Sequence, residues 1–457
     1  MAVCRTIGVM EQRARLPLWF LLANWALIAG AFALGVRLGG NRTAELPDEQ
    51  LIALAVVHRE ILQSHVEPQD GAALLENAIA GMVKELDPHS RYVPPADVAA
   101  YEERNTGHYA GIGADFGTHG DQIVLHFPLA GGAAERADLR PGDVLLAVDD
   151  QRLDTPEVRA RVVDLVRGPA GSSVRLRFAR DGREFEEVLR RGDIQRPCVK
   201  WAHLASAGEG LAYVHLSDFH PGASEQLATA LAALQRDGMR GLVLDLRWNG
   251  GGSLVECVAI ARTFLREGVI LTQTRRDGEV VERHDADAEH CTFPTLPLVL
   301  LVNAGSASAS EVLAGALQDH GRAAIVGQRT HGKGDVNTVY TWKNLPFRLK
   351  LTTGRYRTPL GRDIDRHRAA GTDQAVGGIP PDVEIALSPT QAPEARAALQ
   401  ASEPPAAYRE AYRALAKRLD SPVATAPTPD TDPQLASALS TLRTALATPP
   451  ASTGTHK

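Results

Sequence analysis

Short apolar runs alternate with amphipathic segments through the middle of the 457-residue chain. An apolar run bounded by polar turns predicts a buried strand, and apolar positions repeated every three or four residues predict a helix. Buried strands are predicted at 211–216, 241–246, 296–302 and 323–326, and helices over 224–236, from about 254 and from 312. Strands and helices that alternate in this way predict an α/β domain, which we place at residues 194–389.

A different pattern precedes this domain and predicts a β-rich unit over residues 105–193. Strands are expected at 122–127, 143–148, 174–179 and 184–189, with a helix at 156–166. The dipeptide Asp181-Gly182 between the last two strands is a strong hairpin signal, because it accepts the positive φ angles of a tight turn. Helical periodicity over 51–85 predicts a helical N-terminal region at 41–104.

The two ends of the chain have a different composition. Residues 16–36 form an uncharged run of 21 residues behind the basic segment 1–15, which is long enough for a transmembrane helix. Basic residues before such a run favour a cytoplasmic N-terminus, an inner-membrane anchor and an extracytoplasmic body, periplasmic or at the cell envelope. A cleaved signal peptide is the alternative, because Ala31-Phe-Ala33 has a small-x-small pattern. Residues 390–457 are predicted to be helical at first and then a low-complexity tail.

Composition and charge narrow the functional classes. A hydrophobic fraction of 44% is that of a globular protein with a real core. The net charge of −6 argues against nucleic acid as a general partner. The four cysteines include no CxxC pair, and no His/Cys/Asp cluster has metal-ligand spacing. We therefore expect no disulfide framework, no metal and no other cofactor.

A cluster of serines joins one predicted strand to the helix after it. Asn303-Ala-Gly-Ser-Ala-Ser-Ala-Ser-Glu311 follows the strand at 296–302, so a hydroxyl here lies near the positive end of a helix dipole. A serine nucleophile needs a base, and Lys333 in His331-Gly-Lys-Gly334 would serve if burial lowers its pKa. From the residues alone, a plain helix N-cap and a surface turn are the alternatives, and Ser306, Ser308 and Ser310 are not distinguished.

Two glycine-rich segments are candidate binding sites for anions. Arg247-Trp-Asn-Gly-Gly-Gly252 connects a predicted strand to a helix, and its N–H groups suit an anion. A tight βα turn is the alternative, and a phosphate loop would need a Gly-Lys-Ser/Thr ending that is absent. Tyr109, Ala110, Gly111, Ile112 and Gly113 form the second segment, for which a generic hairpin turn is the alternative. His89, after Pro88, is interpreted as a turn residue rather than a catalytic histidine.

Taken together, these motifs resemble the C-terminal processing (tail-specific) proteases, which are serine peptidases with a Ser–Lys dyad. The resemblance covers about residues 51–387 and is carried by the following segments: 86–92, 247–252, 303–312, 318–322, 326–334, 349–362 and 378–382. Residues 107–191, with Leu139-Arg-Pro-Gly-Asp143, resemble a PDZ domain. The resemblance implies that residues 109–113 are a loop before an exposed strand edge, which binds a terminal carboxylate and an extended peptide. The resemblance implies a multidomain α/β protein in which an N-terminal helical segment and a PDZ-like domain precede a crotonase-like protease domain.

The resemblance also implies roles for individual residues. Ser308 would be the nucleophile and Lys333 the general base, with Gly251 and Ala309 as oxyanion-hole donors and Gly250 or Gly252 as weaker alternatives. Glu311 would support the dyad, and Arg167 would couple peptide binding to the active site. Two positions depart from the family pattern. Asn337 replaces a glutamine that orients the lysine, keeping the amide on a shorter stem. His331 replaces an aromatic apolar residue and would lower the pKa of Lys333 if it carried a charge nearby.

We therefore predict a serine endopeptidase that binds the free C-terminus of a protein substrate through its PDZ domain. Its further expected partners are the membrane and either an adaptor or a second copy of the chain. An inactive or latent PDZ scaffold that binds peptides is the alternative, suggested by Asn337 and His331. A crotonase-like acyl-CoA enzyme is a third hypothesis, because glycine-rich oxyanion loops also occur there.

Overall fold

The computed structural model describes residues 48–366, 377–419 and 426–447, which fall into two compact units that meet at Ala78–Ile79. In the first unit, α2 (Asp48–Ser64) is followed by α3, which starts at Gly71 and continues to Lys84 in the second unit. The His58 ring is hydrogen-bonded to the Gly71 carbonyl at 2.9 Å. Within the described ranges, no helix is long and apolar enough to span a membrane, and the predicted anchor at 16–36 lies outside them.

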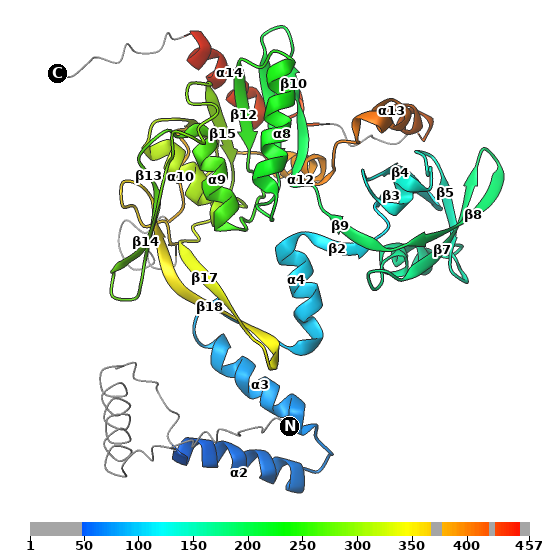
Figure 1. Ribbon diagram of the computed structural model, residues 1–457, viewed down its shortest axis with the longest axis vertical. Helices are drawn as coiled ribbons and strands as arrows, with labels where there is room; N and C mark the ends of the chain where they lie inside the picture. Colours follow the sequence, from blue (N-terminus) through cyan, green and yellow to red (C-terminus); the bar gives the residue numbers. More distant parts are fainter. Residues whose placement is uncertain (1–47, 367–376, 420–425, 448–457) are drawn as a thin grey trace, which may run out of the picture. The chain divides into compact units, whose positions relative to one another are not determined.

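A six-stranded sheet forms the centre of the second unit (Figure 1). Its order is β10 (Val199–Ser206), β11 (Leu211–Leu216), β12 (Gly241–Asp245), β15 (Leu298–Val302), β16 (Ala324–Gly327) and β19 (Val383–Glu384). Only the β10–β11 pair is antiparallel, and the other four pairs in this sheet are parallel. The carboxyl ends of the parallel strands therefore meet at one edge, where ligand sites form in open α/β sheets. The predicted α/β fold class is confirmed.

Helices cover both faces of this sheet. The first face carries α8 (Ala223–Arg236), α9 (Leu254–Phe264) and α10 (Ala309–Asp319), which share one apolar core with it. The second face carries α12 (Gln391–Gln400) and α14 (Pro433–Ala447), whose side chains Leu399, Leu435, Leu439 and Leu442 are buried with those of the strands. An ordered, packed α14 differs from the low-complexity tail predicted there. Its leucines recur at helical spacing between Pro- and Thr-rich flanks, so the sheet supplies the burial that local composition did not indicate.

The PDZ-like domain is built on a second six-stranded sheet. Its strands are β3 (Ala114–His119), β4 (Gln122–Pro128), β5 (Val144–Val148), β6 (Gln151–Arg152), β7 (Ser173–Arg180) and β8 (Arg183–Arg190). The helices are α5 (Ala133–Arg136), α6 (Pro156–Ala160) and α7 (Val162–Val166), so the single helix predicted at 156–166 is broken at Arg161. Asp181 and Gly182 both have positive φ, as the hairpin signal predicted. A further helix, α13 (Arg409–Arg418), packs Tyr412 and Leu415 against the outer face of β4.

A third sheet flanks the active-site edge. It contains β1 (Arg91–Val93), β13 (Val269–Thr274), β14 (Val280–Asp285), β17 (Asp335–Trp342) and the long strand β18 (Leu345–Arg357). Between β1 and the PDZ-like domain lies α4 (Val98–Thr106), and a two-stranded ribbon of β2 (His108–Gly111) and β9 (Gly192–Gln195) joins the start and end of that domain. The third sheet therefore places the strands that follow Lys333 beside the end of the central sheet.

Candidate active site

The turn between β15 and α10, residues 303–311, is called the serine turn from here on. Ser308 has φ 55° and ψ −114°, a strained conformation for a residue with a side chain, and such strain gathers at functional sites. The hydroxyls of Ser306 and Ser310 are buried and donate to the carbonyl oxygens of Leu246 (2.8 Å) and Asn249 (2.9 Å). These two serines therefore hold the turn against a neighbouring loop, whereas Ser308 lines a cavity.

The cavity has a volume of about 630 Å³ and is lined by residues from distant parts of the chain. Ser308 and Lys333 both lie in its wall, with the following further residues: Gly250, Gly251, Gly252, Asn337, Lys350 and Tyr356. The structure thus brings together the predicted nucleophile, base and glycine residues. Among the described residues, no hydrogen bond joins the Ser308 hydroxyl to the Lys333 amine. Catalytic hydrogen bonds are often long without substrate, so the lack of one here does not argue against a Ser308–Lys333 dyad.

Residues 247–252, the glycine loop, follow β12 and pack against the serine turn. Gly251 has φ 98°, and a Cβ there would lie 2.7 Å from the Ala307 oxygen and 2.9 Å from the Ser308 Cβ. Only glycine permits this approach. The Gly251 N–H donates to Asn249 Oδ1 at 2.9 Å, so this predicted oxyanion donor is occupied here. The Ala309 N–H lies in the first turn of α10, where no carbonyl of the helix itself is available to it.

Glu311 connects the two halves of the site. This fully buried carboxylate accepts four hydrogen bonds. One oxygen accepts from the backbone N–H groups of Ser308 (2.9 Å) and Lys333 (2.8 Å). The other accepts from the Thr330 hydroxyl and the Gly332 N–H, both at 2.6 Å. A single side chain therefore ties the serine turn to the residues before Lys333, consistent with the supporting role predicted for it.

Lys333 is partly buried, and its electrostatic surroundings favour the neutral amine. Burial lowers its pKa to about 8, assisted by the positive charge of Lys350 and opposed by Asp335, Glu311 and Asp87. A lysine with this pKa can take a proton near neutral pH, which an ordinary lysine cannot do. This is the electrostatic property expected of a general base.

The two positions that depart from the family pattern are only loosely connected to the lysine. The Asn337 amide N–H donates to Thr352 Oγ1 at 3.0 Å, and its buried Oδ1 has no partner among the described residues. Its amide is in the cavity but forms no hydrogen bond with Lys333 there. His331 has an exposed side chain and holds the serine turn by its backbone, through an N–H bond to the Ser306 oxygen at 2.9 Å.

His89 donates its backbone N–H to Asp87 Oδ1 at 2.7 Å, as a turn residue would.

Two cavity residues were missed by motif reasoning, Lys350 and Tyr356. Both come from β18, where a register shift between Thr352 and Gly354 separates them, so simple alternation does not place them on one face. Burial raises the pKa of the Tyr356 phenol well above its usual value, opposed by a hydrogen bond with Ser308. Strand alternation groups Lys350 with Thr352 only, and the position of Tyr356 depends on the register shift in the pairing of β18 with β17. The sequence gives no signal for that register shift.

The predicted carboxylate-binding segment differs from the expected loop. Tyr109, Ala110 and Gly111 belong to β2 and pair with β9, because Gly192 and Asp193 opposite them continue the ladder. Only Ile112, buried in the PDZ-like core, and Gly113, with φ 71°, remain between β2 and β3. The Tyr109 ring faces the guanidinium groups of Arg167 (4.6 Å) and Arg196 (5.5 Å). These three residues line a second cavity of about 500 Å³.

The helix α4 connects the PDZ-like domain to β18. Glu103 accepts hydrogen bonds from Arg167 and Arg196, both at 2.8 Å, and the neighbouring Glu102 pairs with Arg348 of β18 at 2.7 Å. Two separate sets of ion pairs thus connect α4 to the second cavity and to the strand that carries Lys350.

Comparisons with known proteins agree with the sequence resemblance. The protein-family model for Peptidase family S41 matches residues 210–385, and that for the PDZ domain matches 128–180. A carboxy-terminal-processing protease of Bartonella bacilliformis is 32% identical over 346 residues, covering 74% of this chain and 75% of that protein. A probable CtpA-like serine protease of Staphylococcus haemolyticus is 31% identical over 339 residues, and the match spans 65% of its length. The solved photosystem II D1 C-terminal processing protease has 31% identity and a TM-score of 0.43, over 74% of this chain and 94% of that one.

Proposed function

The chain belongs to peptidase family S41, the family of carboxy-terminal-processing serine proteases, and we propose that it is a serine endopeptidase with Ser308 as nucleophile and Lys333 as general base. The observation that carries this proposal is the shared cavity. A strained serine faces the same space as a partly buried lysine whose pKa is lowered to about 8. The buried hydroxyls of Ser306 and Ser310, which donate to backbone carbonyl oxygens, favour Ser308 as the nucleophile.

The reaction begins when neutral Lys333 takes the proton of the Ser308 hydroxyl. The serine oxygen then attacks the scissile carbonyl carbon, and the negative charge moves to the carbonyl oxygen. The Ala309 N–H and an N–H of the glycine loop stabilise that oxyanion. For Gly251 to be the second donor, its N–H must exchange Asn249 Oδ1 for the oxyanion, and Gly250 and Gly252 are the alternatives.

The resulting Lys333 ammonium donates its proton to the departing amine, which leaves with the C-terminal fragment. Lys333 is neutral again and takes a proton from a water molecule, which attacks the serine ester. Collapse of the second tetrahedral intermediate returns the proton to Ser308 and releases the new carboxylate. No step needs a metal or a redox cofactor.

The PDZ-like domain is proposed to bind the free C-terminus of the substrate. Its β3 is an edge strand, and such an edge can add an extended peptide by backbone hydrogen bonding. Gly113 stands at the start of that edge, and the guanidinium groups of Arg167 and Arg196 lie close by. The ion pairs through α4 provide a physical route by which a bound tail would alter the β18 side of the active site.

We also propose that the enzyme acts outside the cytoplasm. Support comes from the sequence alone, from the uncharged run at 16–36 behind a basic segment. We also propose that an adaptor protein or a second copy of the chain is a partner, because α2 has no buried residue in its own unit.

Cleavage of an unstructured protein with an apolar C-terminus tests the proposed activity. Wild type, Ser308→Ala and Lys333→Ala are compared on this substrate and on a copy whose terminal carboxylate is amidated. We expect cleavage by wild type only, and slower cleavage of the amidated copy because its tail lacks the charge that the PDZ-like domain binds. Cleavage that survives Ser308→Ala would overturn the assignment of the nucleophile. Tail binding without cleavage by the wild type would favour the second candidate, a latent or inactive scaffold, which the unpaired Asn337 Oδ1 suggests.

A further inference from the structure

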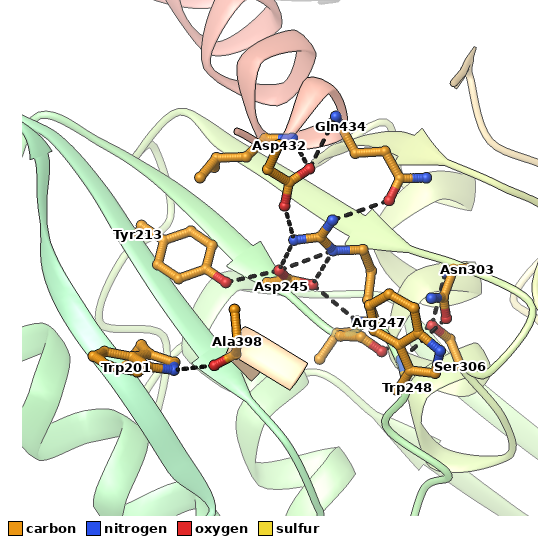
Figure 2. A network of polar contacts seen from close by, with 12 residues as sticks. Trp201, Tyr213, Asp245, Arg247, Trp248, Asn303, Ser306, Ala398, Asp432 and Gln434 are labelled. Carbon is orange, nitrogen blue, oxygen red and sulfur yellow. Dashed lines mark hydrogen bonds and ion pairs between the residues drawn. The ribbon is translucent and has the colours of Figure 1, made fainter. Parts of the chain in front are cut away.

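A buried charge cluster surrounds Arg247, the first residue of the glycine loop (Figure 2). The Arg247 side chain is fully buried, and its guanidinium donates to Asp245 at 2.6 Å, to Asp432 at 2.7 Å and to Gln434 at 3.0 Å. Tyr213 completes the cluster by donating its hydroxyl to Asp245 at 2.8 Å. Figure 2 shows the guanidinium held between Asp245 on one side and the pair Asp432 and Gln434, at the start of α14, on the other.

Burial makes this cluster expensive to form. Removing ions from water costs more than their attraction returns unless the geometry is excellent and every polar atom is paired. Burial alone would raise the pKa of Asp245, but the charge and hydrogen bonds of Arg247 outweigh this and lower it. Apolar side chains of similar size would fill the same space without that cost. A structural reason for an arginine here is therefore its direction-specific hydrogen bonding, which fixes the backbone to which it is attached.

Arg247 is the first residue of the glycine loop, so fixing its backbone fixes the start of that loop. Hydrogen bonds also hold the next two residues: the Trp248 N–H donates to Asn303 Oδ1 at 3.0 Å, and the Asn249 amide donates to the Leu216 oxygen at 2.9 Å. These two contacts come from the central sheet and the serine turn. The Arg247 contacts with Asp432 and Gln434 come from a segment about 185 residues away, beyond the 210–385 range that matches the family model.

We propose that Asp432 and Gln434 are positioning residues for catalysis: they hold Arg247 and thereby fix the glycine-loop N–H groups opposite Ser308. This inference rests on the proposed peptidase function. In this proposal, helix α14 helps to set the geometry of the active site in addition to packing against the sheet. Neither residue lines the cavity, so both act through other residues, and Arg247 is the one that they share.

Gln434 extends the same restraint toward the lysine. Its amide N–H donates to the Ile385 oxygen at 2.7 Å, while the Ile385 N–H donates to the Gly327 oxygen at 2.8 Å at the end of β16. The chain leaves β16 at that glycine and continues to Lys333. One amide of α14 therefore contacts Arg247 directly and, through Ile385, the strand that leads to the base.

The substitution Asp432→Asn isolates the Arg247 contact. One carboxylate oxygen of Asp432 caps α14 by accepting from the N–H groups of Gln434 and Leu435, both at 3.1 Å, and asparagine can keep that cap. The other oxygen, which faces Arg247, becomes an amide N–H₂ that opposes a donor with a donor. Leu439→Ala is the matched control, because it weakens the packing of α14 but leaves every partner of Arg247 in place.

The full chains are assayed well below their melting temperatures, with activity expressed per active site titrated by a serine-reactive phosphonate. We expect Asp432→Asn to lower kcat about tenfold or more with KM unchanged, and Leu439→Ala to lower the melting temperature with kcat per site unchanged. Equal kcat values for Asp432→Asn and wild type, or equal losses in both variants, would overturn the inference. If Asp432→Asn does not fold, Gln434→Met is used, with a smaller loss of kcat expected and an unchanged kcat overturning the inference. A wild type that cleaves nothing would instead overturn the proposed function.

Discussion

The two sides of the active site are restrained to very different degrees. On the serine side, the side chains of Asn249, Asn303, Ser306, Ser310 and Glu311 are all buried and hydrogen-bonded. On the lysine side, Lys333 is partly exposed, the buried Asn337 Oδ1 has no hydrogen-bond partner among the described residues, and β17 ends in exposed aromatic residues. The serine-side residues lie in segments that follow strands of the central sheet. The lysine-side residues lie in or just before the β17–β18 hairpin, which flanks that sheet.

The difference shows where each part of the chemistry is determined. The proposed nucleophile and oxyanion donors are positioned by hydrogen bonds, which weaken steeply when their geometry is disturbed. The base is tuned mainly by burial and by charges acting through space, which change gradually with distance. Changes on the serine side should therefore lower kcat, whereas changes on the lysine side should displace the pH dependence of the reaction.

The largest expected effect is at the glycine loop. We predict that Gly251→Ala lowers kcat by about 10²–10³-fold, because the new methyl group meets the Ala307 oxygen and Ser308 and the residue must keep φ 98°. Gly238→Ala is the matched control, since Gly238 also has a positive φ of 91° but nothing near its missing Cβ. It should lose stability and keep its kcat. Equal activity in the two variants would mean that the glycine loop does not take part in the reaction.

A smaller loss is expected when the two sides are disconnected. In Glu311→Gln, one oxygen that accepts two N–H groups becomes an amide N–H₂, leaving buried donors opposed. We predict a loss of roughly 2–3 kcal/mol in unfolding free energy and a fall of about tenfold in kcat. Denaturant unfolding and turnover per titrated site would measure both. Asp382→Asn, which alters a carboxylate bonded to Ile325 and Gln318, should lose stability without this loss of kcat.

A still smaller effect is expected at the PDZ-like domain. Arg167→Ala removes the ion pair to Glu103 and the contact with Tyr109. We predict a rise of about threefold to tenfold in KM for a substrate with a free tail, and no change for a short peptide that does not reach the domain. The exposed Arg161 provides a control substitution in the same domain. A KM that rises equally for both substrates would contradict a role in tail binding.

The lysine side should respond to pH. If neutral Lys333 is the base, as proposed, kcat/KM should rise as the pH increases through about 8 and then level off. The positive charge of Lys350 lowers that pKa, so Lys350→Met should raise it and displace the profile to higher pH, by about a unit or less. Lys343→Met, in the turn of the same hairpin, should leave the profile in place. A displacement to lower pH would show that the sign of this coupling is wrong.

The chain reveals the serine side more readily than the lysine side. The serine turn and glycine loop follow continuous apolar runs, whose burial on both faces fixes where each strand ends and hence where the loops meet. The cavity position of Lys350 depends on the strand register and on a bulge in β17–β18, neither of which a single sequence specifies. Tyr109–Gly111 resembled a loop because of its glycine, yet a partner strand about 80 residues later converts it into β2.

The buried charge cluster shows a second limit. Arg247 belongs to a recognisable motif, but its partner Asp432 follows a Pro- and Thr-rich segment that local composition identifies as a tail. Ion pairs between such distant positions depend on tertiary packing and have no periodic signature. The sequence indicates α14 only through its leucines at helical spacing, and small and polar residues outnumber these leucines.

Covalent labelling of the serine measures the central claim most directly. The rate at which a phosphonate reagent modifies the wild-type chain is followed against pH, with the modified residue located by peptide mass analysis, and the series is repeated with Lys333→Met. We predict modification at Ser308, with a rate that rises through an apparent pKa near 8 and collapses when the lysine is replaced. Modification at another residue, or a pH profile that Lys333→Met leaves unchanged, would contradict the account.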